Sequence, residues 1–212
     1  MPLQHLHEDL WFPPLSQANA AGIVAVGGDL QPERLLLAYR SGIFPWFNAD
    51  EPPLWWSPDP RCVLFPHEVH ISHSMKQLLR RNAFTISTNQ AFETVITQCG
   101  STRTEGTWIT PGIIEAYTML HKMGVAHSVE AWQNNELVGG LYGIRIGKIF
   151  FGESMFNRVS NASKYTFIHY IQQLQQEGIV LVDCQVHNPH LESLGARMIS
   201  RNEFMNYLHR YC

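Results

Sequence analysis

The sequence predicts an α+β fold: a small N-terminal domain followed by a larger domain with a mixed, mostly antiparallel sheet. Two observations support this prediction. Three strand-like segments follow one another with short turns between them, which is typical of an antiparallel meander. The third segment is then followed by a helix and one more strand, and such a strand–helix–strand unit places its two strands parallel.

The small domain is expected to cover residues 1–62, and the larger domain residues 63–212. Pro32–Ser41 is predicted to be a helix that ends at Gly42. The stretch from Pro45 to Pro66 contains six prolines. Because proline fixes φ and lacks an N–H donor, we expect this stretch to be an ordered connector rather than a regular element.

The larger domain is predicted to begin with helices and one strand. Thr110 and Pro111 are a strong helix start, because threonine caps helices and proline suits the first helical position. The expected elements are a helix at 72–81, a strand at 84–88, a helix at 89–99 and a helix that runs from Pro111 to Met123.

The meander follows, with strands expected at about 126–132, 136–146 and 148–155. Asn134-Asn135 and Gly147-Lys148 supply its turns. We then expect a helix at 161–177 that is closed by Gly178, a strand at 179–186 and a terminal helix at 203–211. This order resembles the architecture of the N-acetyltransferases (the GNAT fold), a likeness that does not by itself give a function.

Bulk properties exclude several classes of protein. With 45% hydrophobic and 16% charged residues, the composition is that of a soluble globular chain. No apolar run is long enough to span a membrane, and no secretory signal is visible. The four cysteines (62, 99, 184 and 212) are scattered, which argues against a disulfide framework and favours a reducing compartment. The net charge of −3 gives no sign of nucleic-acid binding, so a basic surface would have to be local.

Familiar cofactor motifs are also absent. There is no phosphate-binding loop, and Gly139-Gly140 lies within a hairpin rather than between a strand and a helix. In a GNAT-like fold the loop before helix 161–177 would hold the pyrophosphate of coenzyme A, which requires glycine. Residues 157–162 contain none, so coenzyme A is disfavoured. The histidines have no partners at metal-ligand spacing, so no metal site is expected.

The most informative residues are Glu153, Asp183 and Gln185, which end otherwise apolar strand-like runs. Since side chains alternate along a strand, Asp183 and Gln185 are expected on one face, with Cys184 and Val186 on the other. An unpaired polar group in an apolar setting costs roughly 1–3 kcal/mol. From the residues alone, a satisfied hydrogen-bonded pair and a reaction centre both stay open.

Other candidate groups have two interpretations each. One predicted helix carries Lys76, Arg80 and Arg81. These residues form either a solvated face or an anion-binding patch. Trp46 and Trp108 suit core packing or stacking against a base. A further set is either core or the lining of an apolar pocket beside Glu153 and Asp183: Phe150, Met155, Phe167, Tyr170 and Val182.

Several segments resemble, in order and in spacing, the bacterial leucyl/phenylalanyl-tRNA–protein transferase family from about residue 20 to the C-terminus. They are Gly27-Gly-Asp-Leu30, Gly42-Ile-Phe-Pro-Trp-Phe47, Leu54-Trp-Trp-Ser-Pro-Asp-Pro-Arg61, Glu105-Gly-Thr-Trp-Ile-Thr110, Gly152-Glu-Ser-Met-Phe156, Asn161-Ala-Ser-Lys164 and Val182-Asp-Cys-Gln-Val186. The resemblance implies an enzyme that moves Leu or Phe, and Met less well, from aminoacyl-tRNA to a protein with N-terminal Arg or Lys. The product is a degradation signal in the cytoplasm. The family fold is a small N-terminal domain plus a GNAT-related domain, and no coenzyme A, metal or other cofactor is implied.

The same resemblance assigns roles to residues of this chain. Gln185 would hydrogen-bond the attacking α-amine, Asp183 would orient or support it from behind, and Glu153 would bind the cationic N-terminal residue of the acceptor. Trp46 and Trp108 would hold the 3′-terminal adenosine of the tRNA. Lys76, Arg80 and Arg81 would meet its acceptor stem. The donor side chain would occupy a pocket made by Leu141, Phe150, Met155, Phe167, Tyr170, Val182 and Cys184.

An aminoacyl ester is already activated, so orienting a neutral amine against it supplies much of the rate. A neutral Gln cannot act as a base, which leaves Asp183, water or the tRNA ribose to take the proton. The chain departs from the family at His73 and Gln77, where basic residues are common, and lacks a longer C-terminal tail beyond Cys212. Weaker tRNA binding or a different stem preference is therefore expected. The bulky Phe167 and Tyr170 leave the Leu:Phe preference open.

Two alternatives to this transferase remain at this stage. One is a GNAT-type acyltransferase that uses a small acyl thioester, against which the glycine-free loop argues. The other is a non-catalytic protein that binds tRNA or protein N-termini. The joint presence of Glu153, Asp183 and Gln185 argues against the second alternative.

Overall fold

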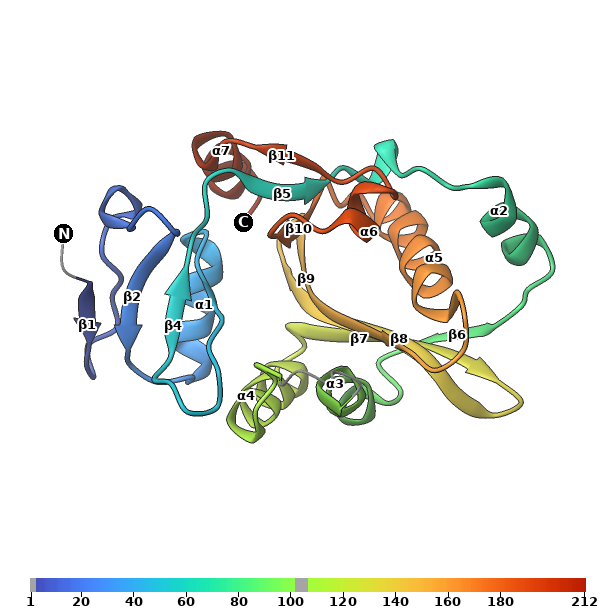
Figure 1. Cartoon of the computed structure of the whole chain (residues 1–212), viewed down its shortest axis with the longest axis horizontal. Helices are drawn as coiled ribbons and strands as arrows, with labels where there is room; N and C mark the ends of the chain where they lie inside the picture. Colours follow the sequence, from blue (N-terminus) through green and yellow to red (C-terminus); the bar gives the residue numbers. More distant parts are fainter. Residues whose placement is uncertain (1–2, 102–106) are drawn as a thin grey trace.

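A computed structural model describes residues 3–101 and 107–212 (Figure 1). These residues form two sheets. The smaller has the strand order β1-β2-β4-β3 and the larger the order β11-β5-β10-β9-β8-β7-β6. The α+β fold class predicted from the sequence is confirmed. Among the described residues, no helix is long and apolar enough to cross a membrane.

The smaller sheet and its helix come from the N-terminal part of the chain. Helix α1 (Pro32–Arg40) is confirmed, and it ends where Gly42 takes a left-handed φ of 73°. The strands are β1 (Gln4–Leu6), β2 (Ile23–Gly27), β3 (Phe44–Pro45) and β4 (Leu54–Trp56), and a short 3-10 turn, η1, covers Leu15–Gln17.

The prediction that residues 45–66 form a connector without regular structure is wrong. Strand β4 pairs with β2 and β3, and β5 (Arg61–Leu64) is buried along its whole length. The prolines lie before, between and after these strands, where missing N–H donors do not interrupt the pairing. Pro45 itself is in the edge strand β3, a position at which proline is tolerated in a sheet.

The larger sheet contains the predicted meander. Strands β7 (Ala126–Gln133), β8 (Glu136–Ile146) and β9 (Ile149–Asn157) pair antiparallel, with β6 (Thr85–Thr88) at the edge. Strand β10 (Leu181–Gln185) pairs parallel with β9, as the strand–helix–strand unit predicts. The sequence did not indicate that the sheet continues, with β5 antiparallel to both β10 and β11 (Arg197–Ile199).

Helices cover both faces of the larger sheet. In Figure 1, α5 lies on one face with α2 beside it, and α3 and α4 lie on the other face. Their bounds are α2 His73–Arg80, α3 Phe92–Ser101, α4 Pro111–Lys122 and α5 Ala162–Gln176. The chain also contains η2 (Pro66–Glu68), α6 (Pro189–Glu192) and α7 (Arg201–Tyr211). The Thr110 cap is confirmed, since its hydroxyl accepts a hydrogen bond from Ile113 N at 3.3 Å.

Helix α3 begins later than the predicted residue 89. Asn89 has a left-handed φ of 59°, and its side-chain oxygen accepts a hydrogen bond from Ser128 N at 3.0 Å. Glu130 of β7 accepts one from Ala91 N at 3.3 Å. These bonds hold residues 89–91 in a turn against β7, so the helix begins at Phe92.

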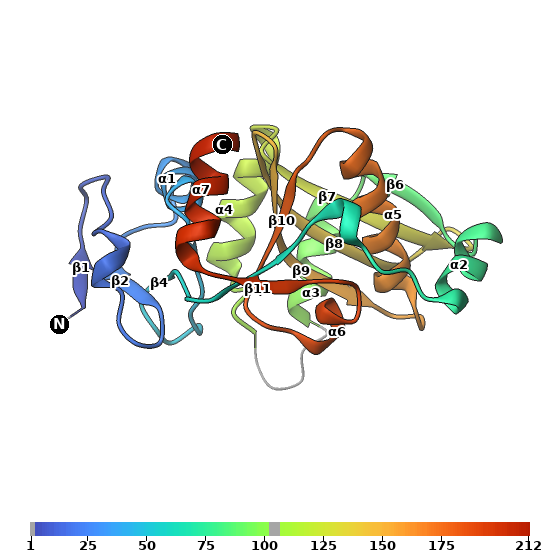
Figure 2. The same cartoon turned by 90° about the horizontal axis from the view of Figure 1, so that it is seen from above.

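The two faces of the larger sheet bury separate apolar clusters. One cluster joins α1 and the smaller sheet to α3, α4 and α7, and the other lies between the sheet and α5. Figure 2 shows the smaller sheet at one end of the molecule and α2 at the other. The proposed division into residues 1–62 and 63–212 stays a prediction, and residue 62 lies within β5.

Candidate active site

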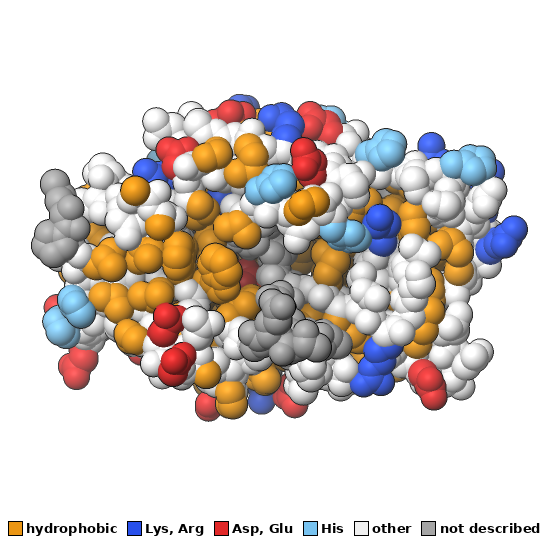
Figure 3. Space-filling model, in the orientation of Figure 1, with side chains coloured by type: hydrophobic (Ala, Val, Ile, Leu, Met, Phe, Trp, Pro, Cys, Tyr) orange, Lys and Arg blue, Asp and Glu red, His pale blue; other side chains and the backbone are white. Residues whose placement is uncertain are grey.

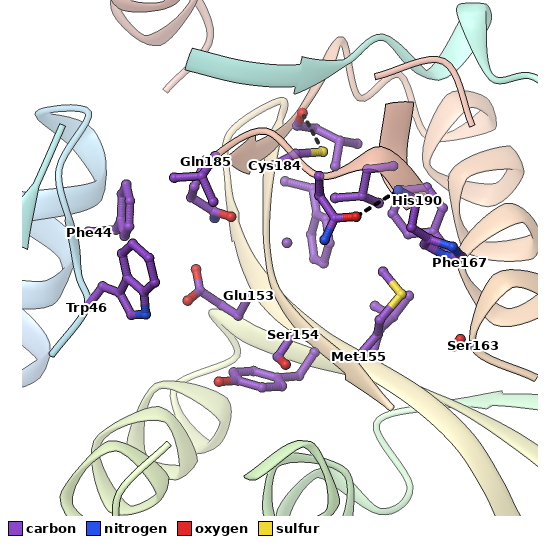
Figure 4. A pocket seen from close by; sticks show the side chains of 18 of the residues that line it. Phe44, Trp46, Glu153, Ser154, Met155, Ser163, Phe167, Cys184, Gln185 and His190 are labelled. Carbon is purple, nitrogen blue, oxygen red and sulfur yellow. Dashed lines mark hydrogen bonds between the residues drawn. The ribbon is translucent and has the colours of Figure 1, made fainter. Parts of the chain in front are cut away.

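A pocket of about 460 Å³ opens where two parallel strands separate. Strands β9 and β10 pair only from Ile149 to Phe151 and from Leu181 to Asp183. Beyond these positions the two strands are no longer paired, and the residues that follow in each of them line the pocket. Figure 3 shows a hollow with hydrophobic side chains on its rim in the middle of this face, and Figure 4 shows the pocket residues.

Glu153 lines the pocket and is half-buried. Tyr39 of α1 donates a hydrogen bond to its Oε1 at 2.8 Å, and Tyr117 of α4 donates to its Oε2 at 3.3 Å. The two tyrosine hydroxyls also lie within hydrogen-bonding distance of each other. Two helices that are distant in the sequence therefore hold one carboxyl group of β9 in place.

The environment of Glu153 favours its neutral form. Burial raises its pKa to about 8, and the nearby charge of Asp183 acts in the same direction. The hydrogen bonds from Tyr39 and Tyr117 and the charge of Arg61 oppose this shift and lower the pKa. A cation that entered the pocket would favour the ionised form.

Gln185 lines the same pocket, but not because of regular strand alternation. Its φ is 58°, which is left-handed, and the pairing of β10 with β5 shifts register between Asp183 and Gln185. The bulge turns the Gln185 side chain toward the pocket that Glu153 also lines (Figure 4). Its Nε2 is buried and has no hydrogen-bond partner among the described residues. That donor lacks the partner that buried polar groups normally have, and a bound ligand could supply it.

Asp183 does not share a face with Gln185, contrary to the prediction. Asp183 is fully buried and binds Arg61 through both carboxylate oxygens, whereas Cys184 and Val186 line the pocket with Gln185. The local cause is the bulge, which breaks the two-residue repeat. Asp183 stays linked to Gln185 because its Oδ1 accepts a hydrogen bond from Gln185 N at 3.0 Å.

Most of the predicted donor pocket lines the observed one. Tyr170 is the exception: it lies behind Phe150, with the two ring centroids 5.1 Å apart in an edge-to-face contact, and does not line the pocket. The predicted residues that do line the pocket are Leu141, Phe150, Met155, Phe167, Val182 and Cys184.

Both predicted tryptophans line the pocket. Trp46 is exposed and packs against Trp56 at a centroid distance of 5.4 Å, whereas Trp108 is buried. Trp56 also donates a hydrogen bond from Nε1 to the backbone oxygen of Trp46 at 2.6 Å. The beginning of the predicted motif 105–110 lies outside the described residues, so only its part from residue 107 onward is placed.

Lys76, Arg80 and Arg81 lie on α2 and its C-terminal cap, and all three are exposed. They do not line the pocket. Helix α2 contacts α5, which supplies Phe167 to the pocket. In Figure 3, Lys and Arg side chains are visible at the α2 end of the molecule.

Sequence reasoning missed other residues at the site. Tyr39 and Tyr117 lie in apolar stripes of helices, where nothing distinguishes them from core residues. Arg61 ends the motif Leu54–Arg61, and nothing in that motif by itself indicates a catalytic or binding role. Further polar residues that line the pocket are Asn157, Ser163, Asn188 and His190. Among the described residues, no group of three or more His, Cys, Asp or Glu side chains is placed to hold a metal ion.

The meander, the parallel β9–β10 pair and a pocket at the point where these strands separate agree with the GNAT-like fold class predicted from the sequence. The family model described as "Leucyl/phenylalanyl-tRNA protein transferase" matches residues 63–209, and the model of its N-terminal domain matches residues 28–59. The chain therefore belongs to the leucyl/phenylalanyl-tRNA–protein transferase family and is an aminoacyltransferase.

Two relatives, from Flavobacterium johnsoniae and Syntrophobacter fumaroxidans, carry the name of this family. The chain is 56% identical to the leucyl/phenylalanyl-tRNA–protein transferase of Flavobacterium johnsoniae, over 97% of this chain and 99% of that protein. It is 52% identical to the enzyme of the same name from Syntrophobacter fumaroxidans, over 98% and 90%. Among solved structures, a GCN5-related N-acetyltransferase from Kribbella flavida covers 80% of this chain and 61% of its own, with 10% identity and a TM-score of 0.39.

Proposed function

We propose that this enzyme transfers Leu or Phe, and Met less well, from aminoacyl-tRNA to proteins that begin with Arg or Lys. The product would be a degradation signal, formed in the cytoplasm. The observation that carries the proposal is a single pocket lined by an apolar surface, a carboxyl group and an unpartnered amide. These three features match the donor side chain, the acceptor cation and the reacting amine.

The apolar part of the pocket is proposed to hold the donor side chain. Phe150, Phe167 and Met155 give a surface without charge, and the flexible thioether of Met155 can adapt to an aliphatic or an aromatic group. Trp46 and Trp108 are proposed to hold the 3′-terminal adenosine, because both line the pocket and aromatic rings stack on bases.

Glu153 is proposed to bind the cationic side chain of the acceptor. Its two oxygens are held by Tyr39 and Tyr117 from behind, so the carboxyl group has a fixed position in the pocket. A guanidinium or ammonium group would supply the charge that the apolar surroundings of Glu153 lack. A neutral acceptor residue would leave the carboxyl group protonated and contribute no ion pair.

Gln185 is proposed to orient the attacking α-amine against the ester carbonyl carbon. Its side-chain oxygen accepts an N–H of the amine, and its Nε2 donates to an oxygen of the aminoacyl group. Asp183 would act from behind, through Gln185. Because both of its oxygens are bound by Arg61, the amine's proton is assigned to water or to the ribose hydroxyl rather than to Asp183.

The test is a transfer assay with radiolabelled Leu-, Phe- and Met-tRNA and three peptides that differ only in the first residue: Arg, Lys or Ala. Label is expected on the Arg and Lys peptides only, with Met the poorest donor. Gln185→Ala should lower transfer by about 100-fold, the loss expected for one group that acts in the transition state. Label on the Ala peptide, or binding of coenzyme A with transfer from an acyl thioester, would overturn the proposal.

A further inference from the structure

Arg61 begins β5 and is fully buried, although it carries a charge. Its Nε and Nη2 donate to Oδ1 and Oδ2 of Asp183 at 2.8 and 2.7 Å, and its Nη1 donates to Gly42 O at 3.2 Å. The rings of Phe44 and Phe204 lie 4.7 and 4.6 Å from the guanidinium carbon. The guanidinium is therefore fixed in its plane by hydrogen bonds and from its faces by aromatic rings.

Stability alone does not account for this ion pair. Each buried charge loses several kcal/mol of hydration, and a well-packed apolar pair of similar volume is often as stable or more stable. What an apolar pair would not provide is a fixed hydrogen-bond acceptor. Asp183 is such an acceptor, and Arg61 determines where its two oxygens lie.

The Arg61–Asp183 ion pair is connected to the pocket through one atom of Asp183. Oδ1 of Asp183 accepts from Arg61 Nε and also from the backbone N–H of Gln185 at 3.0 Å. That second bond holds Gln185 in its left-handed conformation, which is unfavourable for a residue other than glycine. The same conformation turns the Gln185 side chain into the pocket instead of toward β5.

Arg61 also contacts the part of the pocket wall that lies next to Gln185. Gly42 O and the Phe44 ring belong to the segment that enters β3, and Phe44 and Trp46 line the pocket beside Gln185 (Figure 4). One buried cation is thus bound to β10 on one side and to the 42–46 segment on the other. Its position sets the spacing between the amide and the aromatic wall.

We propose that Arg61 is a positioning residue for aminoacyl transfer: through Asp183 it fixes the conformation of Gln185, and through Gly42 and Phe44 it fixes the aromatic wall beside the amide. The inference rests on the proposed role of Gln185. Arg61 touches no substrate. Its contribution belongs to the chemical step, where a displacement of about 1 Å can lower the rate by 100-fold.

The first variant is Arg61→Lys, which keeps the charge but loses the planar fork that binds two oxygens and Gly42 O together. We expect kcat for Leu transfer to an Arg peptide to fall by about 10-fold or more. The KM values for Leu-tRNA and for the peptide should change by less than about threefold, because the groups that contact both substrates remain. Wild-type kcat together with a lower unfolding temperature would overturn the proposal.

The decisive measurement repeats Arg61→Lys in a Gln185→Ala background under single-turnover conditions. If Arg61 acts through Gln185, its replacement has no further effect there, because the group that it positions is gone. If Arg61→Lys lowers transfer by the same factor in both backgrounds, the residue is merely structural and the proposal is wrong. If Gln185→Ala alone transfers like wild type, the proposed role of Gln185 fails first, which is a distinguishable result.

A second pair of variants decides the question even where Arg61→Lys does not fold. Phe204→Leu removes one aromatic face from the guanidinium without touching the pocket, and Phe84→Leu makes the same change in the apolar cluster under α5. At matched stability, Phe204→Leu should lower kcat and Phe84→Leu should not. Equal kcat values for the two variants would overturn the proposal.

Discussion

At the scale of single residues, Glu153 is the group whose chemistry depends most on its surroundings. Its pKa of about 8 lies far above the ordinary value of 4.5, mainly because of burial. The folded protein thus holds the proton more tightly than the unfolded chain does. Glu153 therefore makes the protein less stable as pH rises from about 4.5 to about 8, and a bound cation reverses this effect.

The first prediction concerns the pH dependence of acceptor binding. We compare two peptides that begin with Arg or with citrulline, its neutral isostere, so that titration of the α-amine cancels in the ratio of their Kd values. The preference for Arg should rise by up to about tenfold per pH unit below pH 8 and level off above it, as Glu153 becomes ionised in the free enzyme. Isothermal titration calorimetry from pH 6 to pH 9 measures this ratio.

Two variants test the cause of that pH dependence. Glu153→Gln should give a small preference for Arg that does not change with pH. Tyr39→Phe removes a hydrogen bond that lowers the pKa of Glu153, so the levelling-off point should move to higher pH. A preference for Arg that is independent of pH in the wild-type enzyme would contradict the assignment of Glu153 to the acceptor.

The sequence could predict which polar residues matter, but not how they are oriented. Glu153, Asp183 and Gln185 are conspicuous because each lies in an apolar strand. The left-handed φ of Gln185 depends on a carboxylate held by Arg61, which is 122 residues from Asp183. Local alternation therefore predicted the wrong face for Asp183, and no local pattern could have shown that Tyr39 binds Glu153.

At the scale of elements, periodicity predicted the long helices and the meander, and it missed strands whose signal is weak. Strands β4 and β5 contain three and four residues between prolines, too few to show alternation. Strand β11 is equally short, with three residues. These strands form because partners elsewhere in the chain offer unpaired edges, which is tertiary information. Strand β5 matters most, since it places Arg61 beside Asp183.

The second prediction concerns Gly143 in β8, where the strand passes under a ring of the pocket. A Cβ at this position would collide with the Phe151 carbonyl oxygen and with the Phe150 ring. Gly143→Ala should therefore destabilise the fold by about 1–3 kcal/mol, as overpacking does. It should also push Phe150 into the donor pocket, so that kcat/KM for Phe-tRNA falls more than kcat/KM for Leu-tRNA. Calorimetric unfolding and the two transfer rates measure these effects.

Gly112→Ala is the matched control. A Cβ at Gly112, at the beginning of α4, would meet its nearest atoms at 3.9 Å, which is ordinary contact. In a helix this change is expected to stabilise by about 0.5–1 kcal/mol. The ratio of kcat/KM for Leu-tRNA to kcat/KM for Phe-tRNA should stay at the wild-type value. If Gly143→Ala gave the same ratio as Gly112→Ala, Phe150 would not define the size of the donor pocket.

At the scale of the whole molecule, the charges needed for tRNA binding have to be local, because the net charge is −3. Helix α2 presents Lys76, Arg80 and Arg81 to solvent at the end of the molecule opposite the smaller sheet (Figure 2). It packs on α5, which also reaches the pocket. An acceptor stem whose 3′ end lies in the pocket would extend along this side.

The third prediction follows from this geometry. Each phosphate contact by Lys or Arg adds roughly one unit to the slope of log K against log salt concentration. The double variant Lys76→Ala/Arg80→Ala should therefore reduce the slope for Leu-tRNA binding by about two and weaken binding at low salt. Its KM for an Arg peptide should stay at the wild-type value.

The control, Lys148→Ala/Arg210→Ala, removes two exposed charges near the chain's C-terminus and should leave the slope unchanged. Filter binding from about 50 to about 300 mM KCl, roughly a sixfold range of salt concentration, measures the two slopes. Equal slopes for the two double variants would place the acceptor stem on another surface.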